Sequence, residues 1–99
     1  MIETFTMDLF SGDVGGKYLM HYAGEKIAEL ELISVRDVGS SARQEQFALE
    51  FRAPLDAPIA QGIYHVDHDK LGTLNLFLVP IGRDNNGLVY EAVFNRMIE

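Results

Sequence analysis

The stretch LGTLNLFLVPIGRDNNGLVYEAVFN, residues 71–95, decides the fold of this 99-residue chain. Apolar residues alternate with others on both sides of the segment RDNNG, residues 83–87. Such period-2 alternation is typical of half-buried strands, and Asn and Gly adopt the positive φ angles of tight turns at little cost. The stretch therefore predicts an antiparallel hairpin of two strands, Leu71–Pro80 and Leu88–Asn95.

The register of this hairpin follows if Ile81 and Gly87 flank the loop, which places Leu76 opposite Ala92. One face of the hairpin is then wholly apolar. The other face is mixed and carries Phe77, Val79, Val89, Glu91 and Val93. A face this apolar is unusual for a solvated sheet, so it should be covered either by its own chain or by another subunit. These five residues are our candidate interaction site.

The rest of the chain continues the alternation, with turn residues at intervals of about ten positions. Five further strands are predicted over Thr4–Leu9, Lys17–Tyr22, Lys26–Arg36, Gln44–Arg52 and Gly62–His68. In the fourth of these, Phe47, Leu49 and Phe51 should point inward, and Ala48 and Glu50 outward. The apolar phase shifts between Leu32 and Ile33, which indicates a β-bulge. The sequence predicts one all-β domain over 1–99, a small antiparallel barrel or sandwich of about seven strands.

Composition limits the possible partners and compartments. The chain has 8 basic and 15 acidic residues, a net charge of −7 and no cysteine. A basic footprint for nucleic acid is absent, and an anionic membrane would repel the chain. Disulfides and thiolate metal sites are excluded, and no secretory signal or bilayer-spanning run is visible. We therefore expect a cytoplasmic protein that contacts neither nucleic acid nor membrane, although assembly into a particle is possible.

The second half of the chain resembles a known family. The segments that carry the resemblance are FALEFR (47–52), QGIY (61–64) with His68, LG (71–72), LFLVPIG (76–82) and YEAVFN (90–95). In this order they resemble an uncharacterised family of small bacterial domains, a domain of unknown function. The resemblance implies no catalytic residues. It does imply a genetic neighbourhood, because such proteins resemble accessory components encoded near tail-collar or microcystin-dependent-type proteins.

The densest cluster of possible metal ligands is the segment HVDHD, residues 65–69. His65 and Asp67 share one face of a strand, and His68 lies at its end. Histidine and carboxylate together suit zinc, manganese or iron, but a site needs a further ligand, and His21 is the only other histidine. The alternative is a polar strand end in which His68 bonds to the backbone of the following turn. We expect the alternative, and hence no metal or other cofactor.

Glu91 is the second candidate, since a carboxylate among apolar neighbours is costly unless it is paired. It is either a general acid or base with a raised pKa, or a structural glutamate bonded to backbone, arginine or tyrosine. No nucleophile or second carboxylate is placed near it. The segment DNNG (84–87) lacks the ligand spacing of an EF-hand, and residues 12–16 lack the continuation of a phosphate loop.

Four classes of function remain open. The first is a non-enzymatic structural or interaction protein that assembles with itself, or with a phage-tail-like or other bacterial partner, through the apolar sheet face. The second is a binding module for a small ligand such as a carbohydrate, with Tyr18, Tyr22 and Tyr64 as contacts. The third is an acidic inhibitor of a basic protein. An enzyme is the least favoured, because no triad, dyad or metal constellation is present.

Overall fold

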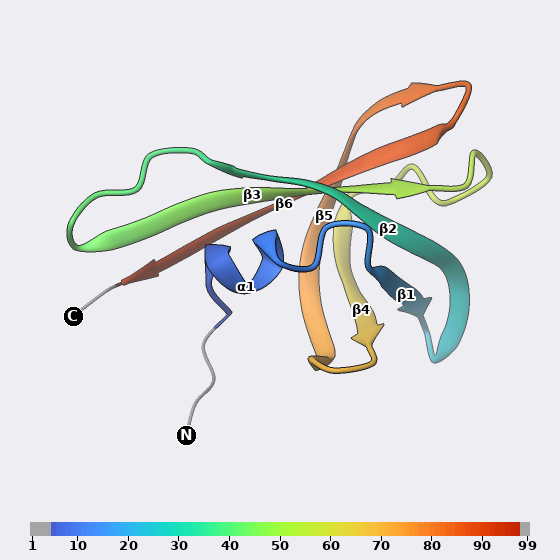
Figure 1. The fold of residues 1–99 in the computed structure, drawn as a ribbon. Coiled ribbons are helices and arrows are strands. Elements are labelled where there is room, and N and C mark those ends of the chain that lie inside the picture. Colours follow the sequence, from blue (N-terminus) through green and yellow to red (C-terminus); the bar gives the residue numbers. More distant parts are fainter. Residues whose placement is uncertain (1–4, 98–99) are drawn as a thin grey trace.

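The computed structural model describes residues 5–97, which form a closed barrel of antiparallel strands in the order β1-β2-β3-β6-β5-β4 (Figure 1). The elements are α1 (Met7–Ser11), β1 (Lys17–Tyr22), β2 (Glu25–Asp37), β3 (Gln44–Ala53), β4 (Gly62–His68), β5 (Gly72–Asp84) and β6 (Gly87–Met97). The predicted all-β class and antiparallel barrel are confirmed. The described residues contain no helix of the length and hydropathy that crossing a membrane requires.

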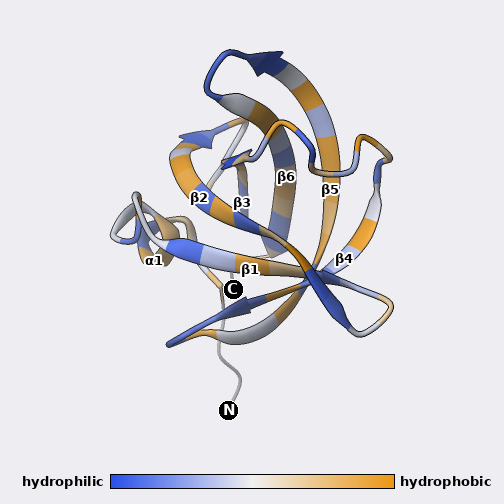
Figure 2. Ribbon diagram, turned by 90° about the vertical axis from the view of Figure 1, so that its right-hand side faces the viewer, coloured by the Kyte–Doolittle hydropathy of each residue, from blue (hydrophilic) through white to orange (hydrophobic). Residues whose placement is uncertain are grey.

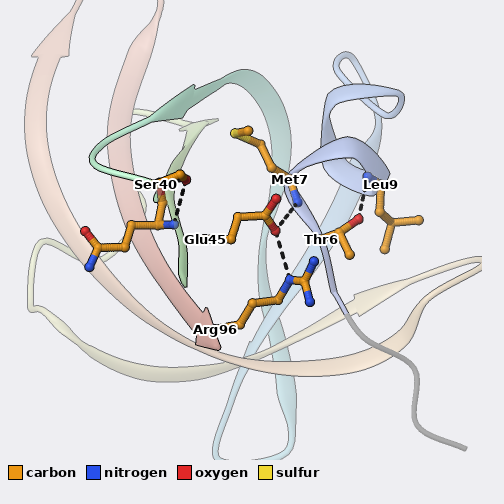
Figure 3. A network of polar contacts seen from close by, with 7 residues as sticks. Thr6, Met7, Leu9, Ser40, Glu45 and Arg96 are labelled. Carbon is orange, nitrogen blue, oxygen red and sulfur yellow. Dashed lines mark hydrogen bonds and ion pairs between the residues drawn. The ribbon is translucent and has the colours of Figure 1, made fainter. Parts of the chain in front are cut away.

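The predicted first strand is wrong. Its first residue, Thr4, lies outside the described residues, and the helix α1 begins at Met7. The side chain of Thr6 caps this helix by accepting a hydrogen bond from the backbone N–H of Leu9 at 3.1 Å (Figure 3). Such a cap satisfies one of the backbone donors that a helix start leaves free. The part of the chain that the structure describes therefore has one strand fewer than expected.

Phe10 explains why the helix forms here. Its side chain is fully buried, and its ring centroid lies 5.3 Å from that of Phe94 and 6.0 Å from that of Phe47. Burying an aromatic ring of this size contributes about 2–3 kcal/mol, more than the difference in local propensity between strand and helix over a few residues. Packing of one side chain has thus overridden the alternation of Phe5, Met7 and Leu9.

The inside of the barrel is filled by alternate residues of every strand, and hydrophobic and hydrophilic bands alternate along the ribbons (Figure 2). Phe47, Leu49 and Phe51 are fully buried, as predicted. Ala48 points outward as expected, yet it is also fully buried. It lies between Arg36 of β2 and Val93 of β6 in the sheet, so neighbours on the outer surface cover its single methyl group.

The predicted final hairpin exists, but its register differs from the expectation. Val79, not Phe77, faces Glu91, and the turn is tightened to two residues between Asp84 and Gly87. The carboxylate of Asp84 accepts a hydrogen bond from the backbone N–H of Asn86 at 2.8 Å and so extends the hairpin toward its tip. A shift of two residues leaves every side chain on its predicted face.

The predicted pair of Leu76 and Ala92 is also wrong. A bulge between Pro80 and Gly82 bends β5, and its pairing with β6 ends at Val79 opposite Glu91. Beyond that point Leu76 pairs with Tyr64 of β4, and Ala92 pairs with Leu49 of β3. The two strands diverge because each is shared between two neighbours, as in a small closed barrel.

The bulge predicted in the second long strand is confirmed. The register of β2 against β3 shifts between Leu32 and Ser34. The ladder with β1 ends at Glu31, just before the bulge, whereas the ladder with β3 begins at Glu31 and continues past the bulge to Asp37. The extra residue bends the strand and lets it serve both neighbours.

The loop between β3 and β4 covers the barrel where β4 begins. Ala57 of this loop is buried. The hydroxyl of Tyr90 donates to the carbonyl oxygen of Pro58, and that of Tyr64 donates to the carbonyl oxygen of Ala60 at 2.7 Å. Two tyrosines of the barrel thus fix the loop.

Candidate functional site

The mixed face predicted from the sequence lies on the outside of the barrel, over β4, β5 and β6. Ile63 of β4 faces Phe77 of β5, and their side chains are 67% and 51% exposed. Val93 of β6 is 63% exposed, whereas Val79 and Val89 are half-buried. We call these five residues the outer apolar face. Within residues 5–97 no second layer covers its most exposed members.

Glu91, the remaining residue of the predicted interaction site, lies between Val89 and Val93 on β6 and is paired with an arginine. Its Oε2 lies 2.7 Å from Nη2 of Arg36, and the same nitrogen lies 3.4 Å from Oε2 of Glu50. The hydroxyl of Ser34 donates a further hydrogen bond to Glu50 at 3.2 Å. This confirms the structural interpretation of Glu91 as a glutamate bonded to arginine. The ion pair is half exposed and contributes about 0–1 kcal/mol to stability.

The histidine cluster is distributed over the outer surfaces of β1 and β4. His21 faces His65 across the two strands, and its Nδ1 lies 3.1 Å from the carbonyl oxygen of Leu19 and 3.6 Å from Oδ2 of Asp67. His65 is bonded to Asn75 of β5. Within the described part of the chain, no three residues of the ligand types His, Cys, Asp and Glu are grouped to hold a metal ion.

His68 stands apart from this cluster. Its Nδ1 accepts hydrogen bonds from the backbone N–H groups of Lys70 and Leu71 at 3.0 and 3.1 Å, which confirms the predicted role in the turn. Because Nδ1 accepts, the ring proton is on Nε2, which donates to Oδ2 of Asp13 at 2.8 Å. The same carboxylate oxygen accepts a hydrogen bond from the hydroxyl of Tyr18 at 2.6 Å.

This Tyr18–Asp13–His68 network was not predicted. Asp13 lies in the loop after α1 and is 55 residues from His68 in the sequence, so no local pattern connects the two. Burial, reinforced by the hydrogen bond to Asp13, raises the pKa of the Tyr18 hydroxyl far above its usual range. A tyrosine that holds its proton so firmly is not a base at neutral pH. The network ties the loop after α1 to the end of β4.

A hollow of about 570 Å³ opens beside the start of β4, at the other end of that strand. Tyr22 and Tyr64 line it with ring centroids 5.8 Å apart, together with Ile27 and Pro58. Tyr18 is fully buried elsewhere in the barrel, so only two of the three tyrosines predicted to bind a small ligand lie together. No local sequence pattern indicates this hollow, because strands far apart in the chain and an irregular loop form it.

Comparison with known proteins gives a family and nothing further. The model of the family described as Domain of unknown function (DUF6916) matches residues 5–94, which is most of the chain and agrees with the resemblance seen in its second half. No curated protein and no solved structure matches the chain. The chain is therefore a member of the DUF6916 family, a domain of unknown function.

Proposed function

We propose that this domain is a non-enzymatic protein that works by protein–protein contact through its outer apolar face. The observation that carries the proposal is the cross-strand pair of Ile63 and Phe77, two large apolar side chains that face each other and are both more than half exposed. Large apolar side chains that adjoin on the surface mark interaction sites more often than isolated ones do.

The energy available from this face is adequate for a specific but modest interaction. An uncovered patch of order 300 Å² contributes on the order of 7 kcal/mol on burial, before the cost of association is subtracted. Arg36 pairs with Glu91 but also with Glu50, so the three side chains keep one net negative charge that a partner would have to pair or leave in contact with water. Contacts at the rim would have to supply the remaining affinity.

The other function classes have weaker support. A carbohydrate site would use exposed tyrosine rings, but Tyr18 is fully buried, and the hydroxyl of Tyr64 is bonded to Ala60. An acidic inhibitor would need its carboxylates gathered on one surface, and part of them form ion pairs with arginines within the chain. The partner of phage-tail type that the family resemblance implies stays a prediction.

Site-specific photo-crosslinking tests the proposal. A photo-reactive amino acid replaces Phe77 in the protein as it is produced in its own cells, and the matched control carries it at Glu31, an exposed position on β2. We expect a protein adduct of discrete mass from position 77 and none from position 31. Equal labelling at both positions, or none at position 77, would contradict the proposal.

A second variant excludes unfolding as the cause. Phe77→Lys places a charge on the outer surface and removes no core side chain, so the free energy of unfolding should change by less than about 1 kcal/mol. The same change should abolish the discrete adduct from a photo-reactive residue at Val79, which lies two residues from Phe77 on the same face of β5. Retention of that adduct at full yield would show that the outer apolar face does not make the contact.

A further inference from the structure

The loop between β3 and β4 holds the backbone on both sides of an exposed apolar residue. Ile59 is 71% exposed and stands between Pro58 and Ala60, two residues that line the hollow described above. The carbonyl oxygens of Pro58 and Ala60 accept hydrogen bonds from the hydroxyls of Tyr90 and Tyr64. A loop whose backbone is already held loses little conformational freedom when a partner covers it, so burial of Ile59 contributes more of its apolar area to affinity.

The hollow next to Ile59 is uncharged. The side chains that line it are Tyr22, Ile27, Pro58, Ala60, Gln61, Ile63 and Tyr64, and the backbone of Gly62 completes it. Tyr22 and Ile27 remain 61% and 37% exposed there. The centres of protein interfaces are likewise depleted in charge and enriched in tyrosine and other aromatic residues. The lining of this hollow thus contains no charged side chain, although the chain has a net charge of −7.

The backbone beside the hollow is also unpaired on one side. The ladder between β1 and β4 covers only His65–Asp67 on β4, so the edge at 62–64 pairs with no strand of the described chain on that side. An open edge of this kind is a template for contact with another chain. It is a feature of the backbone, and it lies beside the same hollow as the exposed side chain of Ile59.

We infer that the hollow receives a second copy of this chain, with Ile59 of each copy seated between Tyr22 and Ile27 of the other. Where a protruding side chain and a hollow lie side by side on one surface, a single two-fold rotation places the side chain of each copy in the hollow of the other. Two-fold symmetry is the commonest symmetry of homo-oligomers. The exposed parts of Tyr22, Ile27, Ile59 and Ile63 amount to about 500 Å² per chain, or about 1,000 Å² in total, the lower limit for a specific interface.

An interface of this size gives a weak, reversible dimer. Each copy carries a net charge of −7, so repulsion opposes association at low ionic strength and is screened at high ionic strength. The dimer should therefore strengthen as salt is added, the reverse of an interface between opposite charges. The inference does not rest on the outer apolar face as the site of function, because the two surfaces share only Ile63.

Sedimentation equilibrium of the purified chain, from micromolar to millimolar concentration, tests the inference. We expect the mass to approach twice that of one chain, at lower concentration in 0.5 M than in 0.05 M salt. Ile59→Lys should raise the dissociation constant at least about 30-fold, as loss of a central contact does. The matched control, Val93→Lys, changes an apolar side chain of similar exposure away from the hollow and should leave the constant unchanged.

Cysteine pairing gives an independent readout, because the chain has no cysteine of its own. Mixing the Ile59→Cys variant with the Ile27→Cys variant under mild oxidation should form a disulfide-linked pair of one chain of each. Mixing Val93→Cys with Ile27→Cys should not. A chain that stays monomeric at millimolar concentration would overturn the inference but leave the proposed function untouched. A dimer that Val93→Lys dissociates and Ile59→Lys spares would also overturn it, and would support the outer apolar face instead.

Discussion

Glu91 and His68 are polar side chains that each bind specific partners. Arg36 binds Glu91, and the backbone of the following turn binds His68 together with Asp13. These bonds satisfy polar groups that the barrel removes in part from water.

Core truncations should separate inward from outward positions on β3. Phe47→Ala and Leu49→Ala should each lower the free energy of unfolding by about 2–5 kcal/mol, because both side chains are fully buried. Glu50→Ala should cost less than about 1 kcal/mol, since its ion pair with Arg36 is half exposed. Urea denaturation measures all three, and equal costs at positions 49 and 50 would refute the assigned alternation.

Phe94 and Ala48 modify this prediction. Phe94 is only half-buried, so its truncation should cost less than that of Phe47, on which its ring stacks at a centroid distance of 5.0 Å. Ala48 is fully buried between Arg36 and Val93, so a larger side chain there would displace those neighbours. An outward orientation alone does not make a position tolerant of substitution.

At the scale of the element, the strands and the final hairpin could be predicted from the sequence, but the register of the hairpin could not. Alternation located all six strands to within a few residues, because one face of each is buried. The prediction of the hairpin register failed at Asp84, because its hydrogen bond from Asn86 extends the ladder toward the tip. The prediction of a strand for the first element failed because Phe10 packs on Phe47 and Phe94, which lie far along the chain. The surface hollow depends on strands brought together only by the closed barrel, so local patterns carried no signal for it.

Gly87 ends the turn of the final hairpin and should tolerate no side chain. Its φ is +141°, and a Cβ atom built there would lie 2.1 Å from the carbonyl oxygen of Ala53. Gly24 is a matched control, since its φ is +83° but a Cβ atom would meet open space. Gly24→Ala should cost about 1 kcal/mol from backbone strain alone, and Gly87→Ala clearly more. Thermal unfolding measures both, and equal costs would show that the contact with Ala53 is relieved without strain.

At the scale of the whole molecule, stability should fall at both extremes of pH. The hydrogen bond from Arg96 to Glu45 at 2.9 Å lowers the pKa of that carboxyl (Figure 3), and the backbone N–H of Asn86 lowers the pKa of Asp84. A lowered pKa means that the folded state holds the proton less tightly than the unfolded state. This contribution is complete above the ordinary carboxyl pKa of about 4 and is lost as the pH falls below it.

The alkaline limit has the opposite sign. Burial raises the pKa of Tyr90 to about 12, from the ordinary value of 10.0. The folded state therefore holds this proton more tightly, and the stabilisation is complete below pH 10 and lost as the pH rises toward 12. Tyr90→Phe should weaken the dependence of the free energy of unfolding on pH in this range, and should lower stability at pH 7 because the bond to Pro58 is lost. Urea denaturation across the pH range measures both effects.

The closure of the barrel also sets the order in which parts of the molecule open. β1 joins β4 through only three residue pairs, Leu19–His21 with His65–Asp67, whereas β3 and β6 are joined through ten. The two sides of this short seam are separated by more than forty residues, and only three residue pairs offset the entropy of closing that loop, so the seam is expected to form late in folding. Brief openings of the native state should begin there, and the amide hydrogens of the seam should exchange with solvent deuterium well before those between β3 and β6. On the timescale of these openings, the barrel would then behave as a curved, open sheet whose two edge strands are β1 and β4.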